Sequence, residues 1–173
     1  INQLHGRFEI ANRDFLYVLS TFVFEPIRWN ARFGWRPLCD QERLGYFHFW
    51  REVGRRMNIR DIPTSYDEFD RFNREYEARE FRYSEESRRV GTATREMFVG
   101  WFPRPLAPLV RSSIHALLDE PLRAAFGFPP APPLLRWLIP RALRWRGGVA
   151  RFLPARRRPR LRITRGLRRR NGV

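Results

Sequence analysis

Histidine is the side chain in this sequence best suited to bind a metal ion or to move a proton near neutral pH. The chain has three, His5, His48 and His115. No two share a metal-ligand spacing such as His-x-x-x-His, no Glu-x-x-His pair occurs, and there is no glycine-rich phosphate loop. The single cysteine, Cys39, excludes an internal disulfide framework and a cysteine-rich zinc site. The metal chemistry left open is a site with one histidine ligand.

The three histidines differ in their sequence surroundings. His48 and His115 lie inside segments of helical periodicity, where a structural histidine is commoner than a ligand. His5 is followed by Gly6, which leaves room for a flat group beside the imidazole. An apolar, aromatic helical bundle around one such histidine is the setting that a b-type haem needs, with the other face of the iron open to dioxygen. His5 is therefore the candidate iron ligand, and a structural role is the alternative.

Two arginines are candidates to bind the carboxylates of such a cofactor. A guanidinium can hold a carboxylate through two parallel hydrogen bonds, and Arg28 or Arg36 could hold a haem propionate in this way. The alternative roles are structural. Glu25 could form an ion pair with either arginine, and Arg36 could stack on the neighbouring Trp35.

Helical periodicity and breaker residues predict the elements that must position these side chains. We expect helices over residues 15–33, 40–57, 84–102 and 109–118, one beginning at residue 64 or 65, and a short one after Pro121. Asn12 or Asp14 would cap the first helix, and Asp40 would cap the second without the glutamate of a capping box. The first helix would bury one face, made of Phe15, Leu19, Phe22, Val23 and Ile27. No strand-like alternation or internal repeat occurs, so the predicted fold is all-α with six or seven helices.

Composition places the charge at one end of the chain. The 173 residues are 43% hydrophobic and 15% aromatic, enough for a buried core, and the net charge is +16. Residues 1–130 hold 20 arginines against 18 acids, whereas residues 131–173 hold 14 arginines and no acid, and lysine is absent. A nearly neutral body argues against a dedicated nucleic-acid-binding protein.

The sequence shows no signal peptide and no run of 18 apolar residues that would predict a membrane-spanning helix. The chain begins with Ile, and we expect a fragment of a longer protein that is cytoplasmic or peripheral to a membrane.

Proline and arginine content suggests a division into four parts. Residues 1–128 form the helical body, 129–133 a proline-rich linker, 134–153 a basic amphipathic segment interrupted by Pro140 and by Gly147-Gly148, and 154–173 an arginine-rich tail. Interleaved tryptophan, leucine and arginine suit an anionic membrane surface, contacted through residues 134–170. The alternatives are one more helix packed on the body, or nucleic-acid binding by the tail.

Several short segments occur in an order and spacing that resemble a known family. The segments are DFLYVLS at 14–20, FEPIRW at 24–29, GWRPL at 34–38, FWR at 49–51 with VG at 53–54, MNI at 57–59, DIP at 61–63, and FN at 72–73 with YE at 76–77. Over roughly residues 1–130 they resemble the oxygenase family that contains the endoplasmic-reticulum-bound oxygenase of mycophenolic acid biosynthesis (MpaB-type) and the rubber oxygenase, or latex clearing protein.

The resemblance implies an orthogonal helical bundle with a globin-like core, here without the family's N-terminal helices. It implies a haem b cofactor with His5 at the position of the axial ligand. The implied reaction uses dioxygen to cleave a carbon–carbon double bond in a hydrophobic prenyl or polyisoprenoid substrate. A related subgroup has a second histidine where Leu19 and Ser20 stand here. The alternative function is a non-catalytic, membrane-associated helical module that binds anionic lipid through its basic C-terminal segment.

Overall fold

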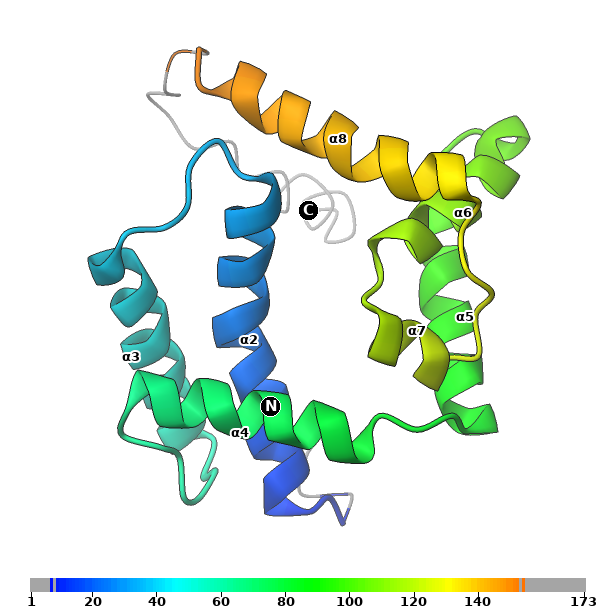
Figure 1. The fold of residues 1–173 in the computed structure, drawn as a ribbon. Coiled ribbons are helices and arrows are strands. Elements are labelled where there is room, and N and C mark those ends of the chain that lie inside the picture. Colours follow the sequence, from blue (N-terminus) through cyan, green and yellow to red (C-terminus); the bar gives the residue numbers. More distant parts are fainter. Residues whose placement is uncertain (1–6, 8, 153, 155–173) are drawn as a thin grey trace, which may run out of the picture.

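The computed structural model describes residues 7, 9–152 and 154, and over these residues every regular element is a helix and none is a strand. The prediction of an all-α fold with six or seven helices is confirmed. The seven α-helices and one 3₁₀ helix are α2 (Asn12–Phe33), α3 (Asp40–Arg56), α4 (Tyr66–Glu80), α5 (Glu85–Val99), η1 (Arg104–Leu106), α6 (Ala107–Leu117), α7 (Glu120–Ala125) and α8 (Pro133–Ala150) (Figure 1). The globin-like relationship stays a prediction.

The helices form two groups joined at both ends. Helices α3 and α4 pack on α2, and α5 packs on α6. Helix α4 crosses α2 at one end of the molecule and leads into α5, as Figure 1 shows. Helix α8 runs along the opposite end, from α6 to the C-terminal end of α2. The long α2 therefore carries contacts on several sides.

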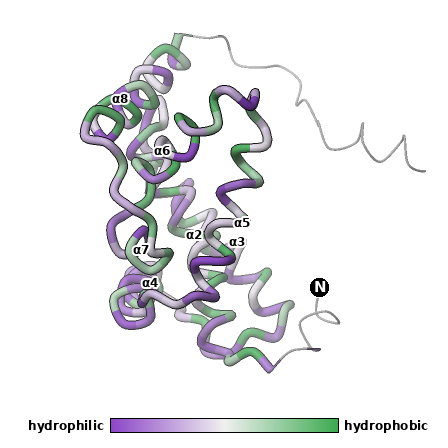
Figure 2. Tube along the Cα trace, turned by 90° about the vertical axis from the view of Figure 1, so that its right-hand side faces the viewer, coloured by the Kyte–Doolittle hydropathy of each residue, from purple (hydrophilic) through white to green (hydrophobic). Residues whose placement is uncertain are grey.

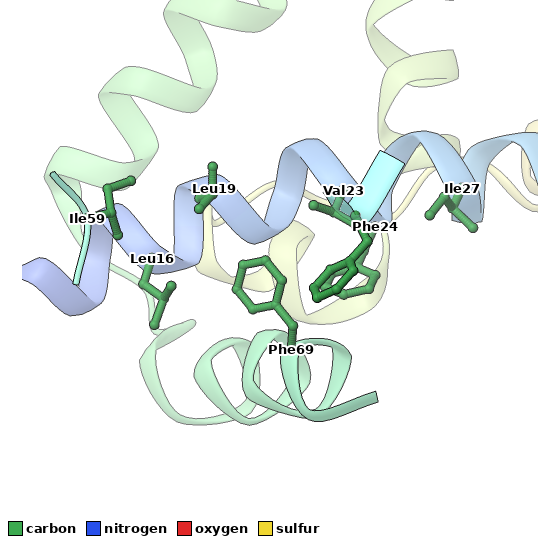
Figure 3. Close-up of a cluster of buried hydrophobic side chains, with 8 residues drawn as sticks. Leu16, Leu19, Val23, Phe24, Ile27, Ile59 and Phe69 are labelled. Carbon is green, nitrogen blue, oxygen red and sulfur yellow. The ribbon is translucent and has the colours of Figure 1, made fainter. Parts of the chain in front are cut away.

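The core lies where α2 meets α3 and α4. Phe24, Phe47 and Phe69 come from these three helices, and each side chain is almost completely buried. Figure 3 shows Phe24 of α2 next to Phe69 of α4. The Phe24 and Phe69 ring centres lie 5.5 Å apart in an edge-to-face arrangement. Burying one such side chain stabilises the fold by about 1.5–3 kcal/mol. Aliphatic side chains fill the space around the rings: Leu16, Leu19, Val23, Ile27 and Ile59.

The buried face of α2 differs in part from the predicted one. Leu19, Val23 and Ile27 are buried as expected, but Phe22 is 47% exposed and the prediction for it was wrong. The physical reason is that α4 packs on the side of α2 that carries Leu16 and Phe24, which rotates the buried stripe away from Phe22.

Two predicted helix caps were also wrong. Helix α2 begins at Asn12 after Ala11, with no side-chain cap, because the Asn12 amide instead bonds both backbone groups of Arg60 at 3.0 and 2.8 Å. Helix α3 is capped by Cys39, and the Glu42 carboxylate accepts a hydrogen bond from the Cys39 backbone N–H at 2.9 Å. A capping box is therefore present where none was predicted, and the cap lies one residue before the predicted Asp40.

Helix α8 runs without interruption, which corrects the break predicted at Pro140 and Gly147-Gly148. Gly147 is buried against the end of α2. A methyl group added at this position would lie 2.5 Å from the Phe33 carbonyl oxygen and 2.9 Å from that of Gly34. Here glycine is needed for the close approach of two backbones.

We expect Gly147→Ala to destabilise the protein by about 1–3 kcal/mol, because the added methyl group would be forced against these carbonyl oxygens. Gly148→Ala is the matched control. Its methyl group would meet no neighbouring atom within 4 Å, so higher helix propensity should stabilise the protein by up to about 1 kcal/mol. Urea unfolding of the complete protein, followed by circular dichroism, measures both changes. Equal unfolding midpoints for the two variants would contradict the close packing of α8 on α2.

Candidate functional site

An apolar groove runs along α2 on the side that faces α3. Its volume is about 560 Å³. Asp14 is the charged residue among those that line it, and its carboxylate accepts a hydrogen bond from the Tyr76 hydroxyl at 2.7 Å. The other lining residues are apolar: Ile10, Phe15, Val18, Leu19 and Phe22 from α2 and its approach, and Trp50, Val53, Met57 and Ile59 from α3 and the following loop.

Close packing of α3 on α2 forms the floor of this groove. A methyl group added at Gly54 would lie 2.3 Å from a Leu19 methyl carbon, so the glycine sets how near the helices come. The Phe22 ring stacks on Trp50, with 4.6 Å between ring centres. Val18 is 50% exposed, beside a half-exposed Phe22. Concave apolar surface of this size is typical of a site for a hydrophobic ligand.

Of the three histidines, the structure describes His48 on α3 and His115 on α6. His5 lies outside the described residues, so its role as iron ligand stays a prediction. His48 is exposed on α3 and does not line the groove. His115 is buried on α6, where its ring stacks on Phe128 and its Nε2 lies 3.1 Å from an Arg95 nitrogen.

His115 therefore has the structural environment that its helical position indicated. Burial and the nearby Arg95 and Arg123 guanidinium groups lower the pKa of its imidazole. Since arginine can only donate, His115 Nε2 accepts the hydrogen bond from Arg95. Among the described residues no cluster of three His, Cys, Asp or Glu side chains is placed to hold a metal ion.

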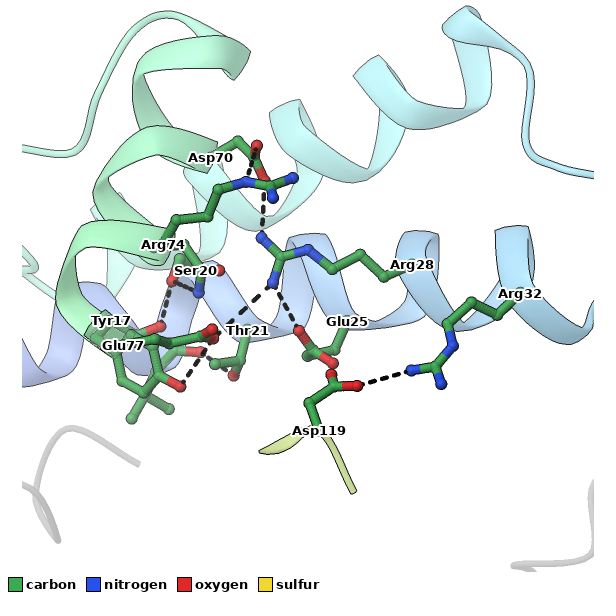
Figure 4. A network of polar contacts seen from close by, with 12 residues as sticks. Tyr17, Ser20, Thr21, Glu25, Arg28, Arg32, Asp70, Arg74, Glu77 and Asp119 are labelled. Atoms are coloured by element: carbon green, nitrogen blue, oxygen red, sulfur yellow. Dashed lines mark hydrogen bonds and ion pairs between the residues drawn. The ribbon is translucent and has the colours of Figure 1, made fainter. Parts of the chain in front are cut away.

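Arg28 projects from α2 into a network of carboxylates on the α4 side, as Figure 4 shows. Its guanidinium donates to Asp70 at 2.8 Å and to Glu25 at 2.9 Å, and Glu77 lies 3.9 Å away. The predicted pairing of Glu25 with Arg28 is confirmed. Arg28 does not line the apolar groove.

Arg36 is also engaged by a carboxylate outside the groove. Its two terminal nitrogens donate to Glu42 at 2.6 and 2.7 Å, and the guanidinium carbon lies 5.0 Å from the centre of the Trp35 ring. The Arg36 hydrogen bonds, with that from the Cys39 backbone, lower the pKa of Glu42 to about 2. Arg36 thus supports the start of α3. A role for Arg28 or Arg36 toward a cofactor carboxylate stays a prediction.

Sequence reasoning missed a buried polar pair beneath this network. Asn73 on α4 is fully buried, and its amide nitrogen donates to the Ser20 hydroxyl at 2.9 Å. The Asn73 amide oxygen has no hydrogen-bond partner. A polar residue one helical turn after the buried Phe69 was the available signal, because that position faces α2.

A second cleft, of about 380 Å³, lies between α2 and the α5–α7 group. It combines an apolar wall with charged residues. Arg32 of α2 pairs there with Asp119, which precedes α7, at 3.0 Å. The lining residues are Glu25, Arg28, Trp29, Arg32, Phe98, Ile114, Leu117, Leu118, Asp119 and Leu122. Because its arginines and acids are paired with each other, this cleft is the weaker candidate for an apolar ligand.

Val18→Trp should fill part of the groove and weaken the binding of an apolar fluorescent probe such as ANS by about tenfold, a loss of about 1.4 kcal/mol. The matched control is Val90→Trp, because Val90 is 65% exposed on α5 and does not line the groove. Fluorescence titration of the complete protein measures both affinities. Equal weakening by the two variants would argue that the probe binds elsewhere.

Burial raises the pKa of the Glu77 carboxyl, although the Arg28 guanidinium opposes this shift. Because the pKa is higher in the folded state than in the unfolded chain, stability is lost as pH rises through the folded-state pKa. Glu77→Gln cannot ionise and keeps an acceptor for the Tyr17 hydroxyl. As the pH rises from about 4 to about 7, the parent should lose stability and the variant should not, so the variant should become more stable relative to the parent.

Urea unfolding at both pH values checks this prediction, with Glu75→Gln on the exposed side of α4 as the control. A stability difference between Glu77→Gln and the parent that does not change with pH would contradict it.

The comparisons with known proteins agree with the resemblance in the sequence motifs. The family described as ER-bound oxygenase mpaB/B'/rubber oxygenase, catalytic domain, matches residues 6–155. The ER-bound oxygenase mpaB of Penicillium roqueforti (strain FM164) is 26% identical over 129 residues, which cover 68% of this chain and 43% of that protein. The ER-bound oxygenase mpaB' of Penicillium brevicompactum is 24% identical over 157 residues, covering 84% of this chain and 37% of that protein.

The chain thus spans about two fifths of the length of these curated relatives. No solved structure matches it significantly. The family match nevertheless includes every described helix, from the start of α2 to the end of α8. The chain therefore belongs to the family of the ER-bound oxygenase mpaB and rubber oxygenase catalytic domain.

Proposed function

We propose that this chain contributes to a haem-dependent oxygenase that cleaves a carbon–carbon double bond in a hydrophobic prenyl-type substrate. Membership of the family supports an oxygenase, which implies dioxygen and an organic substrate. The observation that carries the proposal is the apolar groove between α2 and α3, where the charged lining residue is Asp14. A prenyl or polyisoprenoid chain is apolar along its length, and each buried CH₂ group contributes about 0.8 kcal/mol.

The described residues fit the apolar faces of haem b better than its carboxylates. Phe22 and Trp50 offer flat aromatic surface along the groove. None of the described arginines lines the groove, and Arg28 and Arg36 would have to exchange Asp70 or Glu42 for a propionate. Bound haem would supply the redox chemistry with dioxygen.

The proposed roles of the chain's own residues follow from this arrangement. His5 would bind the iron, and four residues separate it in the sequence from Ile10, the first described residue that lines the groove. The apolar walls would hold the alkene and exclude water. The Asp14 carboxylate would be held in position at the groove, because it accepts a hydrogen bond from the Tyr76 hydroxyl.

A second candidate is a non-catalytic helical module that binds anionic lipid through residues 134–170. Leu19 and Ser20, which stand where a related subgroup has a second histidine, favour it. The two relatives are named ER-bound, and a peripheral location at a membrane is proposed for this chain as well. None of the described helices is long and apolar enough to cross a bilayer.

An absorption spectrum of the complete protein, supplied with haem, distinguishes the two candidates. We expect a Soret band that is lost or shifted in His5→Ala, because the axial nitrogen would be missing. His48→Ala is the matched control and should leave the band unchanged, since His48 is exposed outside the groove.

Three outcomes would count against the haem proposal or its assigned ligand. A colourless parent would remove the haem mechanism and favour the lipid-binding module. A band unaffected by His5→Ala would place the ligand at another residue. A band lost equally in both variants would indicate a general loss of structure.

A further inference from the structure

We propose that the outward face of α8 docks onto an anionic membrane surface, with the helix axis parallel to the bilayer. This face consists of Leu134, Trp137, Leu138, Trp145 and Val149, continued by Phe152 after the helix ends. The inference gives the lipid-binding candidate a defined contact surface. It rests on α8 and holds whether or not the protein is catalytic.

Helix α8 carries apolar side chains on two opposite faces, and Arg141 lies within the outward one. The inward face, toward α2 and α6, is wholly or partly buried. It consists of residues at every fourth position: Leu135, Ile139, Leu143 and Gly147. The residues of the outward face also follow helical spacing, because 134, 138, 145, 149 and 152 are separated by four, seven, four and three positions. A helix packed only as a surface layer of a globular domain would carry polar side chains there.

The outward face is strongly exposed. Leu134 is 68% exposed, Trp145 is 73% exposed and Phe152 is 83% exposed. Several large apolar side chains exposed along one helix face, as opposed to scattered single side chains, mark an interaction surface. Tryptophan is the residue most suited to the boundary between lipid headgroups and acyl chains, because its ring is apolar and its N–H can bond.

Charge around this face identifies the partner as anionic. At 3.6 residues per turn, Arg144 and Arg151 fall on one flank of the outward face and Arg146 on the other. The Arg141 guanidinium lies 4.2 Å from the centre of the Trp137 ring. Residues 131–173 contain no acidic side chain. Apolar side chains flanked by arginines are the pattern of a helix lying in the membrane interface.

The position of α8 in the fold permits such contact. Figure 1 and Figure 2 both place α8 at one edge of the molecule, and Figure 2 shows apolar and polar residues interspersed along it. At about 1.5 Å per residue, its 18 residues give a contact line of roughly 27 Å. The contact of Gly147 with Phe33 would fix the rest of the molecule relative to the bilayer.

Cosedimentation of the complete protein with vesicles tests the proposal. Vesicles of phosphatidylcholine with phosphatidylserine should bind the protein and shift its tryptophan emission to shorter wavelength, whereas pure phosphatidylcholine should bind it more weakly. The double variant L138D/W145D should lose at least about tenfold in affinity for the anionic vesicles. Phe49→Asp is the matched control, because Phe49 is 62% exposed on α3 and is not part of this face. It should bind like the parent.

A second pair of variants tests the charge. R144Q/R151Q should weaken binding by about fivefold for each arginine, the equivalent of about 1 kcal/mol each. R71Q/R89Q removes the same charge from exposed positions on α4 and α5 and should have little effect. Removal of residues 155–173 should reduce vesicle binding without abolishing it, since the outward face of α8 and its flanking arginines remain.

Several results would overturn the proposal. In one, L138D/W145D binds vesicles like the parent, and removal of residues 155–173 abolishes binding. This result would assign the contact to the tail. Another is a parent that binds no vesicle but forms a dimer broken by L138D/W145D, which would make this face an interface between copies. A parent that binds duplex nucleic acid and ignores anionic vesicles would also refute it. Unfolding midpoints equal to that of the parent confirm that the variants are folded.

Discussion

The burial of Phe24 between α3 and α4 is the interaction on which the rest of this structure depends. Its ring contacts Phe69 at 5.5 Å and Tyr66 at 5.3 Å, and Phe47 joins the same cluster from α3. Removing an aromatic side chain from such a core costs about 3–5 kcal/mol, a large part of the stability of a small domain. Since three helices meet here, the groove on one side of α2 and the Arg28 network on another take their geometry from this cluster.

The two sides of α2 have opposite character, and electrostatics explains the separation. Arg28 lies among Glu25, Asp70 and Glu77, where a partly buried cation needs carboxylate partners. Apart from Asp14, the residues that line the groove are aliphatic or aromatic, so a cation there would have few partners. Arg28, a candidate for a cofactor carboxylate because of its guanidinium, lies beside three acids, and two of them, Asp70 and Glu77, come from α4, which is distant in sequence.

The helices could be predicted from the sequence, but several of the contacts that their side chains make could not. Ser84 was recognised as a helix start, and its hydroxyl accepts from the Ser87 backbone N–H at 3.0 Å. Cys39 was not, since cysteine is a rare cap and Asp40 beside it is a common one. Asn12 failed as a cap because the loop at Arg60 competes for its amide. Local sequence signals identify a helix terminus well, except where the capping side chain forms its hydrogen bonds with a backbone group distant in sequence.

The apolar groove and the outward face of α8 have a joint consequence for handling this protein. Detergents have an alkyl chain and a polar headgroup, so a detergent that covers Trp145 and Leu134 can also enter the groove beside Val18 and Phe22. The solubilising agent would then compete with an apolar ligand for the groove. Lipid nanodiscs, which present acyl chains without a pool of free amphiphile, would keep the two surfaces experimentally separate.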